Sequence, residues 1–197
     1  MEINTARLIQ MSITVLDGFK RIEPRDWGVE GTLLELGTEI GSLGRALTIW
    51  ENYRHGYKSR HQLADELSDI LFVLIKLIDD MNITVKDSLT LKRIESSEQA
   101  FFRLLELTTE IRQETTNETV NMKVVLENIE NMISIVGGLA EYYQISLEKS
   151  HLEEMKFASL WQRLFFTSEG KRITHFVFLR KLIWKFATWR HQKKLDN

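Results

Sequence analysis

Cysteine is absent from the 197 residues, and proline occurs only once, at Pro24. Without cysteine the chain has no disulfide framework, no thiolate metal site and no cysteine nucleophile, and we expect a cytoplasmic protein. The scarcity of turn residues favours long helices over sheets. The N-terminal stretch lacks the basic lead and the cleavage site of a signal peptide. No apolar run reaches the length that crosses a membrane.

The net charge of −2 is small but unevenly distributed. Residues 167–197 contain eight Lys or Arg and two Asp or Glu, which gives this segment +6 and leaves −8 for the rest. Apolar residues at helical spacing predict a basic, aromatic C-terminal helix here. Such a helix can lie on an anionic membrane or meet an acidic partner, but we favour docking of residues 170–191 on the acidic body. No motif indicates specific nucleic-acid binding.

Apolar residues recur along most of the chain at the 3.6-residue spacing of helices, which predicts an all-α helical bundle. We expect helices at residues 3–22, 30–50, 61–81, 85–114, 120–143 and 147–166. Gly37, Gly41 and Gly44 fall inside the second of these, where each costs roughly 1 kcal/mol relative to alanine. They therefore indicate close approach by another helix or a ligand. Gly137 and Gly138 are expected to kink or interrupt the fifth helix.

Two short matches indicate a degenerate internal repeat. LLELGTEI at residues 33–40 recurs as LLELTTEI at residues 104–111, and NITVKDS at residues 82–88 returns as QISLEKS at residues 144–150. Chance similarity between leucine-rich amphipathic helices is the alternative. The repeat predicts three parts: a hairpin unit at 1–95, a second copy at 96–166 and the basic helix at 167–197.

A pair of acids precedes a strongly apolar stretch. Glu66 and Asp69 lie three residues apart on one helical face, immediately before the apolar residues 70–75. Carboxylates beside so apolar a segment are costly unless a positive group meets them. Glu35 and Glu39 share a face of the preceding helix by the same spacing rule.

Hairpin arithmetic predicts that these acids converge. Glu39 and Asp69 are equidistant in sequence from Arg54, and so are Ser42 and Glu66, so each pair should sit level across an antiparallel hairpin. Clustered hard oxygen ligands suit Mg²⁺ or Mn²⁺, which take phosphate oxygens as further ligands. The alternative is that the acids form the solvated side of an ordinary amphipathic hairpin.

The segments LLELGTEIGSL (33–43) and ELSDILFVLI (66–75) resemble the ExxE…ExxD signature of the MazG-like nucleoside triphosphate pyrophosphohydrolases. That superfamily includes MazG, the dCTP pyrophosphatases and the dimeric dUTPases. The stretch Arg25-Asp26-Trp27 is also similar to one in dCTP pyrophosphatases. The resemblance covers about residues 25–92. It implies an all-α fold in which four acids hold Mg²⁺, and in which water attack on the bound triphosphate releases a nucleoside monophosphate and pyrophosphate.

The resemblance also implies roles for single residues. Glu39, Glu66 and Asp69 would be the metal ligands and catalytic residues, and Ser42 stands where the family has its second glutamate. Lys92 falls where the family places a phosphate-contacting lysine, although the Lys-Asn pair expected just after it is absent here.

Two further residues are candidates for substrate binding on their own chemistry. Trp27 could stack on a nucleobase, or could be a packing anchor at a helix entrance. Arg54, at the tip of the hairpin, could approach a phosphate or lie in a solvated loop.

In the second copy, hairpin symmetry places Glu110 level with Asn131, and Gln113 level with Asn128. Amides thus replace acids, so this half would keep the fold without the metal. It would act as the second subunit of an internal pseudo-dimer, the other possibility being a homo-oligomer such as a dimer.

We therefore expect a Mg²⁺-dependent nucleoside triphosphate pyrophosphohydrolase. The alternative is a MazG-like pseudoenzyme that binds a nucleotide or a protein without hydrolysis, and a third possibility is a scaffold organised around the basic tail.

Overall fold

The computed structural model describes residues 1–173, 183–185 and 187–188. The named elements follow one another as β1 (Glu2–Asn4), α1 (Thr5–Ile22), α2 (Gly28–Trp50), α3 (Arg60–Asp80), β2 (Ser88–Thr90), α4 (Ser97–Thr116), α5 (Met122–Tyr142) and α6 (Leu147–Phe165). The predicted all-α bundle is confirmed, with a single two-stranded ribbon added to it among these residues.

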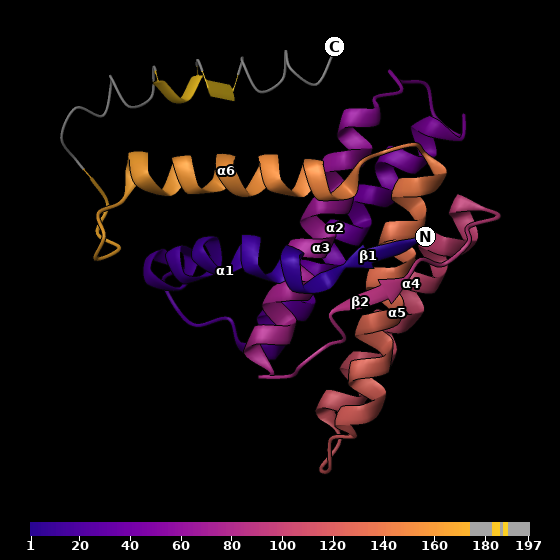
Figure 1. The fold of residues 1–197 in the computed structure, drawn as a ribbon, viewed down its shortest axis with the longest axis horizontal. Helices are drawn as coiled ribbons and strands as arrows, with labels where there is room; N and C mark the ends of the chain where they lie inside the picture. The colour runs from indigo at the N-terminus through magenta and orange to yellow at the C-terminus, as the bar shows by residue number, and fades with distance from the viewer. Residues whose placement is uncertain (174–182, 186, 189–197) are drawn as a thin grey trace.

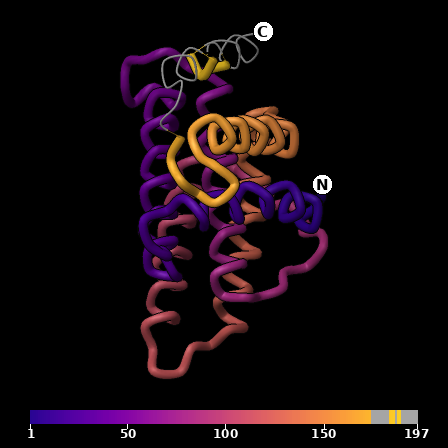
Figure 2. The backbone as a smooth tube through the Cα atoms, turned by 90° about the vertical axis from the view of Figure 1, so that its left-hand side faces the viewer, coloured from indigo at the N-terminus to yellow at the C-terminus, as the bar shows by residue number. Residues whose placement is uncertain are grey.

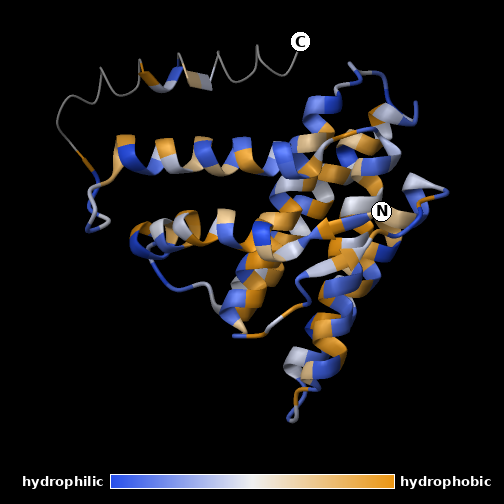
Figure 3. Ribbon diagram, viewed as in Figure 1, coloured by the Kyte–Doolittle hydropathy of each residue, from blue (hydrophilic) through white to orange (hydrophobic). Residues whose placement is uncertain are grey.

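Two helical hairpins form the centre of the bundle (Figures 1 and 2). In the α2–α3 and α4–α5 hairpins each helix packs along its sequence neighbour, and the hairpins join through α2 against α4 and α3 against α5. Helices α1 and α6 lie side by side, cross this central group and cover α3. Figure 3 shows apolar stripes along the helices, which indicate that one face of each is buried. The apolar residues at helical spacing line a common core, as the periodicity predicts.

The segment before α4 is extended, so the predicted helix over residues 85–114 is wrong in its first third. Ser88–Thr90 pairs antiparallel with Glu2–Asn4, with Leu89 opposite Ile3, and both apolar side chains are buried. The strand alternates exposed and buried residues, as a half-buried strand does. Helix α4 begins only at Ser97, because the Ser96 side chain accepts a hydrogen bond from the backbone N–H of Gln99.

The N-terminal helix is also shorter than predicted at its start. Residues 2–4 form β1, and α1 begins at Thr5. Asn4 caps the helix, because its side-chain oxygen accepts a hydrogen bond of 2.9 Å from the backbone N–H of Arg7. The ribbon thereby ties the start of the chain to the connection between the two hairpins.

Helix α5 runs without a break through Gly137 and Gly138, so the interruption predicted there is wrong. The glycines instead allow the extended segment after β2 to lie against the helix. A Cβ atom on Gly138 would sit 2.1 Å from the carbonyl oxygen of Lys92, and one on Gly137 would sit 2.4 Å from Leu91 Cδ2. The backbone N–H of Lys92 donates to the Ser134 carbonyl at 3.2 Å, which fixes this close approach.

The glycines of α2 differ from one another. A Cβ on Gly44 would meet the Phe101 ring at 2.7 Å, whereas Gly37 and Gly41 have nothing within 4 Å. Close approach by another helix therefore explains Gly44, whereas Gly37 and Gly41 border cavities and have no helix against them.

Alanine substitutions at these glycines should have opposite effects. Gly138→Ala is expected to lower the free energy of unfolding by about 1–3 kcal/mol, because its methyl group meets a backbone oxygen that cannot move aside. Gly41→Ala, the matched control in an open helical position, is expected to gain up to about 1 kcal/mol. Urea denaturation of both variants measures the difference. A Gly138→Ala variant as stable as Gly41→Ala would contradict the packing described for α5.

The two segments of the second sequence match have the same local structure. Asn82 and Gln144 both take the left-handed conformation, with φ of 50° and 58°. The next residue in each case donates its N–H five residues back, from Ile83 to Ile78 and from Ile145 to Ala140. Both helices thus end in the same type of C-terminal turn. Superposition of the two complete hairpins stays a prediction.

A buried histidine connects the three helices α1, α3 and α6. His151 is fully buried, its Nε2 lies 2.7 Å from Ser12 Oγ, and its Nδ1 lies 3.1 Å from Ser68 Oγ. Ser12 Oγ donates to the Leu8 carbonyl at 3.0 Å, and both ring nitrogens of His151 have a serine hydroxyl within hydrogen-bond distance. Burial lowers the pKa of His151 to about 4, so this imidazole is neutral at pH 7.

The segment after α6 begins with a turn, which contradicts a continuous helix from residue 170. Phe166 bridges to Arg172, and Gly170 has a φ of 78°. Most of the predicted helix over 170–191 lies outside the described residues. Within them, Trp184 stacks on Phe157 of α6 at 4.3 Å between ring centroids. No helix in the described part of the chain has both the length and the apolarity that crossing a membrane requires.

Candidate metal centre

Three carboxylates from two helices converge where α2 and α3 pack together. Glu39 comes from α2, and Glu66 and Asp69 come from successive turns of α3. One carboxylate oxygen from each residue lies within 4.8 Å of the other two. The structure therefore brings together the three acids that the hairpin arithmetic places level with one another.

The position of the cluster follows from the amphipathic pattern of the two helices. Ile40 and Leu43 of α2, and Leu67 and Ile70 of α3, are fully buried and fix the hairpin register. The three acids occupy the neighbouring helical positions, at the edge of this apolar contact, and are half-buried. They cannot turn fully into water without separating the helices.

Burial and mutual repulsion perturb all three acids. The pKa of Asp69 is raised to about 8, by burial first and then by the nearby Glu39 charge. The pKa of Glu66 is raised to about 7 by burial and by Glu39. Burial, followed by the charge of Glu35 and a hydrogen bond that the protonated Glu39 carboxyl donates to Glu35, raises the pKa of Glu39. The site thus favours bound protons or a bound cation.

In the described part of the chain the charge of Arg45 acts on Glu66 and lowers its pKa, but the larger effect of burial outweighs it. None of the three carboxylates forms an ion pair there with a lysine or arginine. Glu35 adds a fourth acid one turn before Glu39. Oxygen-only donors at this spacing fit a hard divalent ion such as Mg²⁺ or Mn²⁺.

Ser42 lies one turn after Glu39 on α2 and is half-buried. A serine hydroxyl is a neutral oxygen ligand. The negative charge around a bound ion would therefore come from the carboxylates alone.

The predicted substrate-binding residues are only partly brought to this site. Trp27 precedes α2 and lines a cavity together with Glu39 and Asp69. Arg54 lies in the exposed loop before α3. Asp69 lies nine residues after the start of that helix, so roughly 14 Å of helical rise separates the acid from the end of this loop. Lys92 has an exposed side chain, and its backbone packs on α5. Neither of these two cations lines the cavity.

Lys76 is a cavity residue that the sequence patterns did not reveal. It is 3% exposed and lies seven residues after Asp69 on the same helix. Its Nζ pairs with Asp80 at 3.2 Å and lies 5.4 Å from the centroid of the Trp27 ring. The available signal was a single lysine inside an apolar run, where a charge is rarely placed without a partner.

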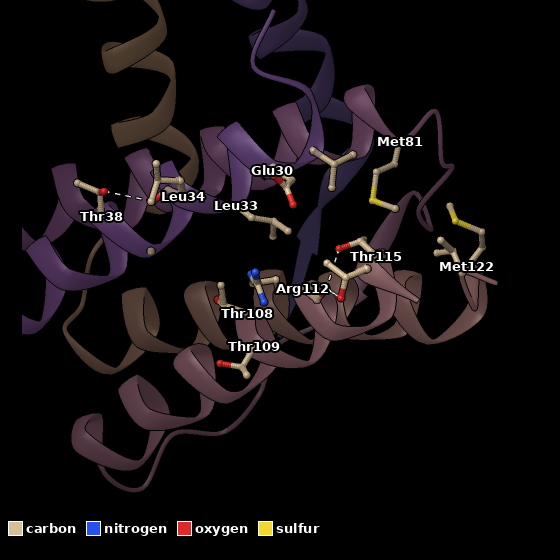
Figure 4. A pocket seen from close by; sticks show the side chains of 14 residues that line it. Glu30, Leu33, Leu34, Thr38, Met81, Thr108, Thr109, Arg112, Thr115 and Met122 are labelled. Carbon is tan, nitrogen blue, oxygen red and sulfur yellow. Dashed lines mark hydrogen bonds between the residues drawn. The ribbon is translucent and has the colours of Figure 1, made fainter. Parts of the chain in front are cut away.

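The largest cavity among those found lies elsewhere, between the start of α2 and the second half of α4 (Figure 4). It has a volume of about 740 Å³, and leucine, methionine and threonine side chains form much of its wall. Glu30 and Arg112 project into it from opposite helices. None of the clustered acids lines it, so cavity size does not identify the site here.

The second hairpin arranges the corresponding residues differently. Glu110 pairs with Arg103 at 2.9 Å between Oε1 and Nη1. Asn131 is exposed, whereas Asn128 is buried. The positions that correspond by sequence therefore have different surroundings in the two hairpins.

No protein-family model, curated protein or solved structure matches the chain. The functional argument therefore depends on the geometry and chemistry of the carboxylate cluster.

Proposed function

We propose that the protein is a Mg²⁺- or Mn²⁺-dependent nucleoside triphosphate pyrophosphohydrolase of the MazG-like kind. The observation that carries the proposal is the convergence of Glu39, Glu66 and Asp69, half-buried and unpaired with any cation among the described residues. The motif resemblance of the same two helices supports it. A solvated acidic face would not require three carboxylates to share so small a space.

The chain's own residues would have distinct tasks in this reaction. Glu39, Glu66 and Asp69 would hold the ion, which when bound offsets phosphate charge and acidifies a coordinated water. Glu35, whose charge acts on Glu39 from one turn away, would add negative charge beside the ion. The rigid α2–α3 contact would keep the donors in place without reorganisation. The α4–α5 hairpin would replace a second subunit by packing on the metal-binding hairpin.

The direct test measures pyrophosphate and nucleoside monophosphate formation from a panel of ribo- and deoxyribonucleoside triphosphates. We expect release to require Mg²⁺ or Mn²⁺ and to produce no inorganic orthophosphate, because cleavage falls between the α- and β-phosphates. A panel with no metal-dependent pyrophosphate release would reject the enzyme proposal.

The thermal shift produced by Mg²⁺ should increase with pH. The raised pKa values of Asp69 and Glu66, about 8 and about 7, mean that the metal-free protein loses stability as pH rises from about 4 through these values. Mg²⁺ binds the ionised site only, and binds the folded state only. We expect a shift of several degrees at pH 8.5 and little shift at pH 5.5, measured by differential scanning fluorimetry. An equal shift at both values would place the metal elsewhere.

Ser42 is the observation that favours the alternative, a pseudoenzyme that binds nucleotide without cleaving it. Ser42→Glu supplies the carboxylate at the position where the resemblance expects one. If the wild type is a weak enzyme, we expect tighter Mg²⁺ binding and faster turnover in this variant. Nucleotide binding without cleavage in the wild type, with cleavage gained in Ser42→Glu, would establish the alternative.

A further inference from the structure

A cavity of about 400 Å³ adjoins the carboxylate cluster, and its wall contains five aromatic side chains together with charged ones that include Glu23 and Lys76. Glu35, Glu39 and Asp69 are among its lining residues, so the cavity and the candidate metal centre are continuous. Its volume falls in the range of roughly 300–1,000 Å³ that is usual for small-molecule sites.

The aromatic wall is assembled from helices that are distant in sequence. The ring centroid of Phe19 in α1 lies 6.1 Å from that of Trp161 in α6, and these two rings are stacked. The Phe19 centroid lies 5.9 Å from that of Phe72 in α3. Phe166, just after α6, lies 5.1 Å from Trp161. Aromatic faces of this kind stack on planar rings of a ligand.

Lys76 provides a fixed polar group in the same cavity. Asp80 pairs with its Nζ, and the Thr32 hydroxyl donates to Asp80 at 2.5 Å, so the lysine is held in position. An ammonium group has three N–H donors and no acceptor. Lys76 also lies seven residues after Asp69, or roughly 10 Å along α3, which leaves room for a sugar between the metal centre and a ring that reaches the lysine.

We propose that this cavity binds the base of the nucleoside triphosphate, and that it selects uracil, which has a carbonyl at C4, over cytosine, which has an amino group there. The inference rests on the proposed function, because the triphosphate would lie at the adjoining carboxylates. The base stacks on the wall of Phe19, Trp161 and Phe166, and its carbonyl accepts a hydrogen bond from Lys76. Helices α1 and α6 thus complete the substrate site, although both lie outside the region of motif resemblance.

The test compares three ligands by calorimetry in the presence of Mg²⁺, on the full-length protein. The α,β-methylene analogue of uridine triphosphate carries a base and resists cleavage at the expected bond. Inorganic triphosphate carries the phosphates without a base. In the wild type we expect the analogue to bind at least tenfold tighter than inorganic triphosphate, and tenfold tighter than the matching cytidine analogue.

Two variants change the cavity in different ways. Trp161→Leu removes part of the stacking wall, and Val73→Phe fills the cavity from α3. Each should weaken the uridine analogue about tenfold and leave inorganic triphosphate unchanged. Phe102→Leu, an exposed aromatic position on α4, is the matched control and should change neither affinity. Thermal unfolding of each variant verifies that it is folded.

The outcomes separate this inference from the proposed function. If no ligand binds the wild type with Mg²⁺, both proposals fail. If inorganic triphosphate binds as tightly as the uridine analogue, and neither cavity variant changes the analogue's affinity, the base site is wrong while the metal centre stands. Equal affinity for the uridine and cytidine analogues overturns the selection by Lys76.

Discussion

Replacing Asp69 with asparagine is expected to reduce pyrophosphate release by more than about a hundredfold. Mutation of a residue that only hydrogen-bonds to a metal ligand can already cost up to about a hundredfold. The same change should remove the Mg²⁺-induced thermal shift. It should also stabilise the metal-free protein, because the folded state raises the pKa of Asp69 from 3.8 to about 8. The carboxyl is ionised in the unfolded chain at pH 7 and takes up a proton on folding, which opposes folding by on the order of 4 kcal/mol. Asparagine has no such cost.

Asp65→Asn is the matched control, because Asp65 lies one turn before Asp69 on α3 and pairs with His61 rather than with the cluster. It should retain metal-dependent activity within a few fold. Pyrophosphate assays and thermal scans with and without Mg²⁺ measure both variants. If Mg²⁺ stabilises Asp69→Asn as much as the wild type, the acids are a solvated face and the enzyme proposal falls.

Acid should weaken the junction of α1, α3 and α6 through His151. Its folded pKa of about 4 lies below the ordinary value of 6.5, so the neutral imidazole contributes stability that is present above pH 6.5 and is lost as pH falls toward 4. The difference corresponds to about 3 kcal/mol. His151→Gln, which cannot take up this proton, should be less stable than the wild type at pH 7 and should lose less stability on acidification.

Urea denaturation at pH 7.0, 5.5 and 4.5 tests this expectation. The stability difference between wild type and His151→Gln should shrink by about 2–3 kcal/mol between the first and last of these values. His55→Gln, in the exposed loop before α3, should keep the wild-type slope. An unchanged difference across the pH series would show that His151 is not the group responsible.

Local periodicity was sufficient to predict the helices and the carboxylate cluster. The cluster depends only on two adjacent helices, and equal sequence distances from a single loop determine which side chains meet. The predicted helix over residues 85–96 is wrong, because residues 88–90 pair with residues 2–4 and the flanking backbone of Lys86 and Lys92 is hydrogen-bonded to α5. A strand of three residues gives only a weak sequence signal, because the alternation of exposed and buried residues is so short.

The aromatic wall of the cavity could not have been predicted in the same way. Phe19 and Trp161 come from the first and the last of the named helices, and nothing in their local patterns specifies their contact. The sequence does not indicate that Lys76 lines a cavity, because its charge can be paired within α3 by Asp80, one turn further along. Each of these features depends on how α1 and α6 dock, which is a property of the whole chain.

The docking of α1 against α6 also sets the order in which a newly made chain can acquire its site. The α2–α3 hairpin, with its three carboxylates, has emerged from the ribosome well before α6 has been synthesised. Trp161 follows Asp69 by 92 residues, which at roughly 5–20 residues per second takes about 5–18 seconds. During that interval the part of the apolar face of α1 that packs on α6 stays exposed, and a nascent chain could bind metal ions before it could bind a base.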